Sequence, residues 1–96
     1  MDLLLEIEKL SNWRQEESQI RRIYTFDTFH DAITYMSNVA PYCDEIDHHP
    51  EWKNVYNKLD VVLTTHDENG ITIKDINLAK YLDSAFNKQI DETRIR

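Results

Sequence analysis

Cysteine, glycine and proline are scarce: the 96 residues include one cysteine, one glycine and two prolines. A lone cysteine, Cys43, forms no internal disulfide, so the sequence excludes a secreted disulfide scaffold and fits a reducing cytosol. The single glycine, Gly70, lies in a polar segment, where we expect a loop that uses a positive φ. Pro41 interrupts a helical pattern, and we expect a kink or a break there because proline lacks the backbone donor.

Basic residues and long apolar runs are also few. Lys and Arg number 11 against 18 Asp and Glu, which gives a formal net charge of −7. Binding of nucleic acid depends on neutralising phosphates with basic side chains, and no basic stripe supplies them, so we expect no direct contact with DNA or RNA. The first ten residues lack the basic head of a signal peptide. No stretch approaches the roughly 20 apolar residues of a membrane helix, so we expect no membrane insertion.

The pattern of apolar residues predicts three helices and four strands. Helical spacing occurs in three segments and alternation in four shorter ones. Asp27 or Thr28 can cap the second helix, and residues 72–75 have the form of a capping box at the start of the third. The predicted elements are a helix over 3–10, strands over 13–17 and 19–26, a helix over 28–46, strands over 51–56 and 58–65, and a helix from 72–75 to about 90, followed by a frayed end over 91–96.

These elements predict the fold class. Short turns at 17–18 and 57–58 join the strands in two pairs, which indicates antiparallel pairing. We therefore expect an α+β fold: a four-stranded antiparallel sheet with three helices packed on one face, a two-layer sandwich. The length fits one domain, residues 1–96. A chain of this size buries roughly 60–65% of its unfolded surface, which leaves no room for a deep cavity.

Three of the four histidines lie at predicted junctions between elements. His48 and His49 stand side by side in the segment DHHPEW, between a helix and a strand, and His66 lies at the C-terminal end of the strand over 58–65, next to a loop. A fold can open a cleft at either place, so we expect these imidazoles to meet in space. Histidine has an unperturbed pKa of about 6.5, which suits it to give or take a proton near neutrality. An ordinary loop position is the alternative for the doublet. His30 falls on the polar side of a helix, where we expect a surface residue.

Two other kinds of chemistry are less well supported. Three imidazoles could hold zinc, but adjacent residues in an extended chain point to opposite sides, and neither H-E-x-x-H nor C-x-x-C occurs. A metalloprotein therefore stays as a minor hypothesis. Nucleophilic catalysis lacks a G-x-S-x-G elbow, and Cys43 falls on an apolar helix stripe, where structural thiols lie. That stripe, the predicted core face, is Phe29, Ala32, Ile33, Met36, Val39, Ala40 and Cys43.

Residues 47–83, DHHPEWKNVYNKLDVVLTTHDENGITIKDINLAKYLD, resemble the signature region of the pterin-4a-carbinolamine dehydratase family. The family pattern is an HHP triplet, an aromatic residue, a tyrosine, an alternating strand, a Thr-His pair, a glycine-containing loop, an aspartate and an alanine within a helix. Residues 13–46 fit more loosely, so the resemblance covers nearly the whole chain. The matching positions are His48, His49, Pro50, Trp52, Tyr56, Thr65, His66, Gly70, Asp75 and Ala79.

The resemblance implies an enzyme, a hydro-lyase that dehydrates 4a-hydroxytetrahydrobiopterin to the quinonoid dihydropterin. This reaction recycles the pterin cofactor after aromatic amino-acid hydroxylation. The family uses no metal, no cofactor and no covalent intermediate. One proton must reach the departing 4a-hydroxyl and another must leave N5 of the ring, and histidine suits both tasks.

The resemblance also implies roles for individual residues. His48, His49 and His66 are the expected catalytic residues, with His48 and His66 as the acid–base pair and His49 holding the ring. Asp75 is expected to orient a histidine or to meet the substrate, although its place in the capping box permits a structural role alone. Asp44 stands where the family often has glutamate, and a solvated helix charge is the alternative there. The expected substrate-binding set is Asp44, His48, His49, Pro50, Trp52 as a wall, Thr65, His66, Asp67, Glu68 and Asp75, with no metal ligand.

The partners implied by the resemblance are a pterin substrate and further copies of the chain. We expect a homodimer or homotetramer in the cytoplasm. Some members of the family also serve as dimerisation cofactors of a homeodomain transcription factor, which makes the nucleus a second possible location. A non-catalytic binding module of that kind is the alternative function. The only feature that favours it is the apolar face of the last two helices, which would equally serve self-association.

Overall fold

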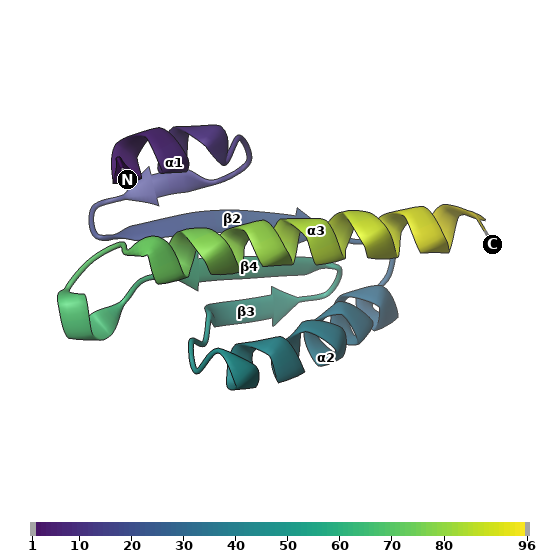
Figure 1. The fold of residues 1–96 in the computed structure, drawn as a ribbon. Helices are drawn as coiled ribbons and strands as arrows, with labels where there is room; N and C mark the ends of the chain where they lie inside the picture. Colours follow the sequence, from purple (N-terminus) through teal and green to yellow (C-terminus); the bar gives the residue numbers. More distant parts are fainter. Residues whose placement is uncertain (1, 96) are drawn as a thin grey trace.

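The computed structural model describes residues 2–95, and the predicted order of helices and strands is confirmed (Figure 1). A short 3-10 helix, η1, lies where we expected a loop, and the predictions for Met1 and Arg96 fall outside the described residues. The elements are α1 (Leu3–Lys9), β1 (Arg14–Glu16), β2 (Gln19–Thr25), α2 (Phe29–Glu45), β3 (Glu51–Val55), β4 (Lys58–Leu63), η1 (His66–Glu68) and α3 (Ile73–Ile95).

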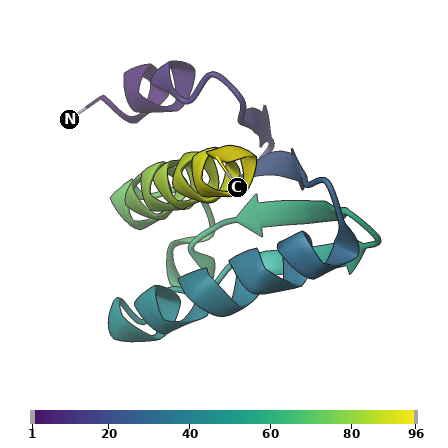
Figure 2. The same ribbon diagram turned by 90° about the vertical axis from the view of Figure 1, so that its right-hand side faces the viewer.

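Two antiparallel hairpins, β1–β2 and β3–β4, form the sheet. They join through β2 and β4, which pair antiparallel with Tyr24 opposite Leu59, so the strand order is β1-β2-β4-β3. The first hairpin turns at residues 17–18 as predicted, whereas the second turns at 56–57, one residue earlier than expected. All three helices lie on one side of the sheet (Figure 2), which confirms the two-layer α+β sandwich.

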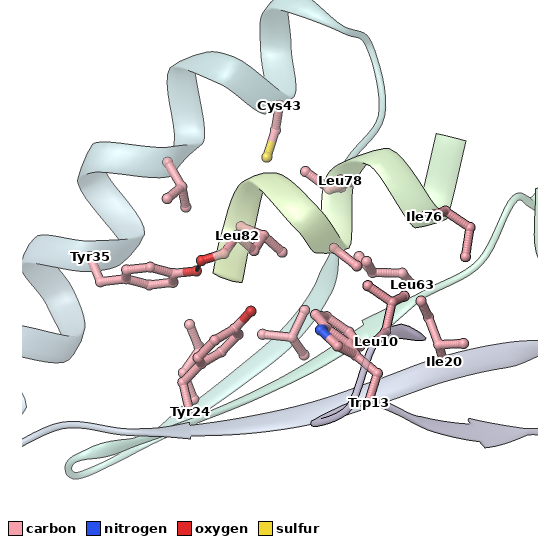
Figure 3. Close-up of a cluster of buried hydrophobic side chains, with 14 of the residues drawn as sticks. Leu10, Trp13, Ile20, Tyr24, Tyr35, Cys43, Leu63, Ile76, Leu78 and Leu82 are labelled. Carbon is pink, nitrogen blue, oxygen red and sulfur yellow. Dashed lines mark hydrogen bonds between the residues drawn. The ribbon is translucent and has the colours of Figure 1, made fainter. Parts of the chain in front are cut away.

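The core lies between the sheet and the helices (Figure 3). Alternate residues of β2 and β4 face it, and Tyr24 and Leu59 have no exposed surface. The Tyr35 hydroxyl donates to the Leu82 carbonyl oxygen at 2.8 Å, which joins α2 to α3 above the sheet. Burial of one large apolar side chain contributes roughly 1.5–3 kcal/mol, so packing of this kind holds both helices at fixed positions. The C-terminal end of α2 and the N-terminal end of α3 are thereby placed near the same end of the sheet (Figure 1).

The core face of α2 differs in part from the predicted stripe. Phe29 and Ile33, which we expected to face the core, are 50% and 39% exposed. Tyr35, which we did not include, is completely buried. Its ring centroid lies 5.4 Å from that of Tyr24 and 6.2 Å from that of Phe86. Contact with this aromatic cluster places the Tyr35 side of α2 against the core. The buried residues of α2 are Ala32, Tyr35, Val39 and Cys43.

The predicted break at Pro41 is wrong, because α2 runs without interruption from Phe29 to Glu45. Pro41 is exposed, so its ring lies on the solvent side of the helix and not against the sheet. Packing holds the helix on both sides of it. Val39 and Cys43 are buried, and the Tyr42 ring stacks on the Tyr81 ring of α3 with centroids 3.8 Å apart. Tertiary contacts therefore outweigh the loss of one backbone donor.

The last helix is longer than expected. The predicted frayed segment is helical as far as Ile95. Its second half is tied to α2, because the Gln89 side-chain amide donates to the Asp31 carbonyl oxygen at 2.9 Å. Within residues 2–95, no helix combines the length and the apolar composition that crossing a bilayer requires.

Candidate active site

The end of α2 sets the direction in which the histidine doublet leaves the helix. The backbone N–H of His48 donates to the Cys43 carbonyl oxygen at 3.1 Å, and that of Asp47 donates to the Asp44 carbonyl oxygen at 3.2 Å. These two bonds form a Schellman motif, which requires one residue in the left-handed conformation. Asp47 takes that conformation, with a φ of 53°. The backbone of His48 is therefore fixed by helix-terminal hydrogen bonds.

Replacing Asp47 by glycine is expected to stabilise the protein. Glycine adopts a positive φ without the steric penalty of a Cβ atom, and it is the usual residue at this place in the motif. Glycine also gives the unfolded chain more freedom, which offsets part of this gain. We expect a net rise of about 0.5 kcal/mol in the free energy of unfolding and of about 2–4 °C in Tm. Thermal unfolding followed by circular dichroism measures it. Asp47→Val serves as the opposite case and should lower Tm; an Asp47→Gly protein less stable than the parent would contradict the strain assigned to Asp47.

His48 is held by a buried carboxylate. Its Nε2 lies 2.6 Å from Oδ1 of Asp75, and the two side chains are 11% and 0% exposed. A carboxylate only accepts hydrogen bonds, so Nε2 carries the proton of this pair and Nδ1 is the nitrogen left for another partner. The contact spans 27 residues of sequence and ties the end of α2 to the start of α3.

Asp75 serves the helix and the histidine together. Its Oδ2 accepts the backbone N–H of Thr72 at 2.9 Å, which is the reciprocal half of a capping box. The same oxygen accepts the Thr65 hydroxyl at 2.8 Å. Three donors thus converge on one buried carboxylate, which makes both the cap and the orientation of His48 depend on it. Because Asp75 has no exposed surface, it is placed to orient a histidine and not to touch substrate.

His49 faces a second carboxylate at the surface. Its Nε2 lies 2.9 Å from Oδ1 of Asp44, and the side chains are 55% and 80% exposed. Asp44 lies in the last turn of α2, so this pair spans the Schellman motif. A hollow of about 160 Å³ opens beside it and is lined by Ala40, Cys43, Asp44, His49, Pro50 and Trp52.

Cys43, which also lines that hollow, is 2% exposed. Burial raises the pKa of the Cys43 thiol, and the negative charge of Asp44 adds to the effect. A thiol kept protonated is a poor nucleophile, so this geometry agrees with the structural role expected for Cys43.

His66 belongs to a loop that is closed by backbone hydrogen bonds. The Thr65 N–H donates to the Gly70 carbonyl oxygen at 2.9 Å, and the Gly70 N–H donates back to Thr65 at 3.3 Å. Asn69 provides the left-handed residue of this loop, with a φ of 52°, and Gly70 has no positive φ. Our expectation for Gly70 is therefore wrong by one position. Asparagine tolerates this conformation because its short polar side chain can bond locally.

A third carboxylate faces His66. Nε2 of His66 lies 2.9 Å from Oε1 of Glu51, the first residue of β3. Both side chains are exposed, at 78% and 58%. All three histidines therefore use Nε2 toward a carboxylate, and Nδ1 is the nitrogen that each has left for a substrate.

The three histidines border one hollow of about 310 Å³ at the end of the sheet. This volume lies at the lower end of the ~300–1,000 Å³ range of small-molecule sites. His49 lines both this hollow and the smaller one, so the two meet there. Among the predicted substrate-binding residues, Asp44, Pro50 and Trp52 line only the smaller hollow, and Glu68 and Asp75 line neither. The larger hollow is lined by Asp47, His48, His49, Thr64, Thr65, His66, Asp67 and Lys74.

Several of these residues were missed from the sequence. Lys74 carried a usable signal, because it lies in the first turn of α3, where the helix dipole favours acidic residues over basic ones. Within residues 2–95, it is the single lysine among the residues that line the larger hollow, and no arginine lines it. Asp47 carried none, since its left-handed backbone becomes visible only in the structure. Glu51 stood next to the doublet in DHHPEW, but its contact with His66 depends on the register of β3 on β4.

Within residues 2–95, the side chains that could bind a metal ion are not arranged around a common point. No three His, Cys, Asp or Glu side chains in this part of the chain converge as a bound ion would require. Each imidazole Nε2 is instead directed at its own carboxylate.

Comparison with known proteins gives the family. The family model described as "Pterin 4 alpha carbinolamine dehydratase" matches residues 2–85. The chain belongs to this family. The match includes the three histidines and the carboxylates that face them. A protein of Bordetella avium (strain 197N) with the provisional name pterin-4-alpha-carbinolamine dehydratase is 45% identical over 87 residues, covering 88% of this chain and 81% of that protein.

A second sequence relative and a solved structure agree with this family. A protein of Prochlorococcus marinus (strain NATL2A) with the same provisional name is 44% identical over 81 residues, covering 84% of this chain and 85% of its own. A solved structure from Brucella melitensis, described as a transcriptional coactivator/pterin dehydratase, superimposes with a TM-score of 0.82 at 36% identity. That superposition covers 86% of this chain and 90% of the other.

Proposed function

We propose that this protein dehydrates 4a-hydroxytetrahydrobiopterin to the quinonoid dihydropterin, acting as a hydro-lyase in pterin recycling. The observation that carries the proposal is the hollow of about 310 Å³ bordered by His48, His49 and His66. Each imidazole is oriented by a carboxylate, which is the arrangement that acid–base catalysis uses to fix a ring and its tautomer. Membership of the family supports the choice of substrate.

The reaction needs one proton given and one taken. The bond between C4a and the hydroxyl oxygen breaks, a proton from an imidazolium joins the departing hydroxyl to form water, and the N5 proton passes to a neutral imidazole. One of His48 and His66 performs the first transfer and the other performs the second. The electron pair of the N5–H bond forms the new double bond between N5 and C4a, so the step balances without an oxidant and without a covalent bond to the protein.

The surroundings of the histidines suit a flat polar ring. His49 lies where the two hollows meet, and it holds the ring between the acid and the base. Trp52 and Pro50 supply apolar surface on the side of the smaller hollow, while Thr65 and Asp67 border the other side. Asp44 keeps His49 in place through the contact at 2.9 Å. Asp75 acts only through His48.

The direct test is dehydration of enzymatically generated 4a-hydroxytetrahydropterin, followed by the loss of its ultraviolet absorbance. We expect the purified protein to accelerate this loss well above the rate in buffer alone. Pretreatment with a chelator should leave the rate unchanged, whereas a metalloprotein would lose activity together with stoichiometric zinc. A rate equal to that in buffer would overturn the proposal.

A second function is favoured by one observation, the description of the Brucella melitensis structure as a transcriptional coactivator. Acting as a dimerisation cofactor would use a helical surface and not the histidines. We therefore expect a variant with His48 and His66 both changed to alanine to keep any binding to a transcription-factor dimerisation segment in a pulldown. Loss of that binding in the double variant would place the partner at the catalytic site and reject a separate coactivator surface.

The assembly and location that we propose follow the same family membership. Residues 1–96 act as one domain, located in the cytoplasm and associated as a homodimer or homotetramer. Phe29 and Ile33 of α2, 50% and 39% exposed, supply apolar surface for association. Light scattering at micromolar concentration should give two or four times the mass of one chain, and a mass equal to one chain would contradict this assembly.

A further inference from the structure

His66 is the least enclosed of the three site histidines. Its side chain is 78% exposed, against 55% for His49 and 11% for His48. Packing therefore does not select one rotamer of its ring, and an exposed side chain ordinarily samples several. Within residues 2–95, the one side-chain hydrogen bond of His66 is that from Nε2 to Oε1 of Glu51, at 2.9 Å. Any fixed orientation of this imidazole must come from that contact.

The backbone places the two residues where they can meet. Glu51 lies opposite Val62 in the β3–β4 ladder, so the two side chains stand on the same face of the sheet. The backbone leaves β4 after Leu63 and enters η1 at His66. The backbone pairing of Thr65 with Gly70 holds the chain in place at this point. Both ends of the contact therefore start from fixed backbone positions.

We infer that Glu51 is a positioning residue for His66 in the dehydration, an inference that rests on the proposed function. Glu51 accepts the Nε2–H, which fixes both the rotamer of the ring and the nitrogen that carries the proton. Nδ1 is then the unprotonated nitrogen of the neutral ring, and His66 lines the hollow. Asp75 and Asp44 stand in the same relation to His48 and His49, so Glu51 completes a set of three imidazole–carboxylate pairs.

The inference gives the segment DHHPEW a second role. It supplies two of the three imidazoles and also the carboxylate that orients the third, which comes from a loop 15 residues further along the chain. Pro50 stands between the doublet and Glu51, and its fixed φ limits how far the two parts can move relative to each other.

The test compares Glu51→Ala, Glu51→Gln and the control Glu45→Ala in the dehydration assay. Glu45 is an exposed acidic residue at the end of α2 that lines neither hollow, so its removal changes the net charge by the same amount. For Glu51→Ala we expect kcat to fall roughly tenfold to a hundredfold, by analogy with the loss of carboxylates that orient histidines in metal sites, with little change in KM. Glu51→Gln should recover part of the loss, because its amide oxygen still accepts. Glu45→Ala should match the parent.

A second measurement separates this inference from the proposed function. Three-bond NMR couplings about χ1 of His66 should report one rotamer in the parent protein and averaging in Glu51→Ala. Unchanged couplings in Glu51→Ala, with or without a loss of kcat, would overturn the positioning role. A parent protein that shows no dehydration would reject the proposed function instead, and the couplings would still decide whether Glu51 holds His66.

Discussion

Replacing Asp75 by asparagine is expected to remove most of the dehydratase activity and to destabilise the fold. The carboxylate accepts from His48 Nε2, the Thr65 hydroxyl and the Thr72 backbone N–H. Asparagine offers one oxygen, and its NH2 group must face at least one of these donors. A buried donor left without a partner costs about 1–3 kcal/mol. We therefore expect the free energy of unfolding to fall by about 2 kcal/mol and Tm to fall by roughly 8–16 °C.

The same substitution releases His48 from its fixed orientation. We expect kcat to fall about a hundredfold or more, the lower range for loss of one general acid or base. Thr28→Ala is the control for instability, because it removes the cap of α2, where the Thr28 hydroxyl accepts from the Asp31 backbone N–H at 3.0 Å. This cap lies at the opposite end of α2 from the histidine doublet. That variant should lose about 1 kcal/mol of stability and keep its activity. Full activity in Asp75→Asn at a temperature where it is folded would show that His48 needs no carboxylate.

Replacing His66 by alanine is expected to reduce kcat about 10²–10⁴-fold, the range for a general acid or base, with little loss of stability. The ring is 78% exposed, and within residues 2–95 its one side-chain hydrogen bond is to Glu51, so its removal leaves no buried cavity. The matched control is His30→Ala, since His30 is an exposed histidine of α2 far from the hollow. Steady-state dehydration rates and thermal unfolding of both variants separate catalysis from folding. If His66→Ala dehydrates the pterin as fast as His30→Ala, then His66 is neither the acid nor the base.

The order of elements and the fold class could be predicted because both depend on local patterns. The apolar period separates helices from strands, and the cap at Thr28 and the turn at 17–18 lie where the sequence places them. The pairing of β2 with β4 could not be predicted in this way, because it joins residues about 40 apart and no turn sequence encodes it. That pairing brings the two hairpins into one sheet and sets the position of both later helices.

Local rules failed where packing outweighs them. Proline at position 41 should interrupt a helix, yet the stacking of Tyr42 on Tyr81 and the buried Cys43 hold the chain helical beyond it. Glycine at position 70 should take the left-handed conformation, yet Asn69 takes it. In both cases the residue type sets a preference of a few kcal/mol or less, and tertiary contacts set the outcome.

The histidines of the candidate site could be predicted from the sequence, and the family resemblance also pointed to Asp75 and Asp44, but the partner Glu51 could not be predicted. His48, His49 and His66 stand at junctions of elements, and the prediction that they border one hollow agrees with the structure. The contact of His66 with Glu51 depends on strand register, and that of His48 with Asp75 depends on how α2 and α3 approach each other. The capping-box pattern correctly identified Asp75 as a helix-terminal residue but could not show that its second oxygen faces an imidazole.

The central claim is that the His48–His49 doublet and the distant His66 act on one pterin. NMR of the imidazole rings tests it most directly, because the chain has only 4 histidines and each ring can be assigned. We expect titration with a 7,8-dihydropterin to shift the ring signals of His48, His49 and His66 along one binding curve and to leave His30 unchanged. A titration that shifts the doublet while His66 stays in place, or that shifts none of the three, would contradict the shared site.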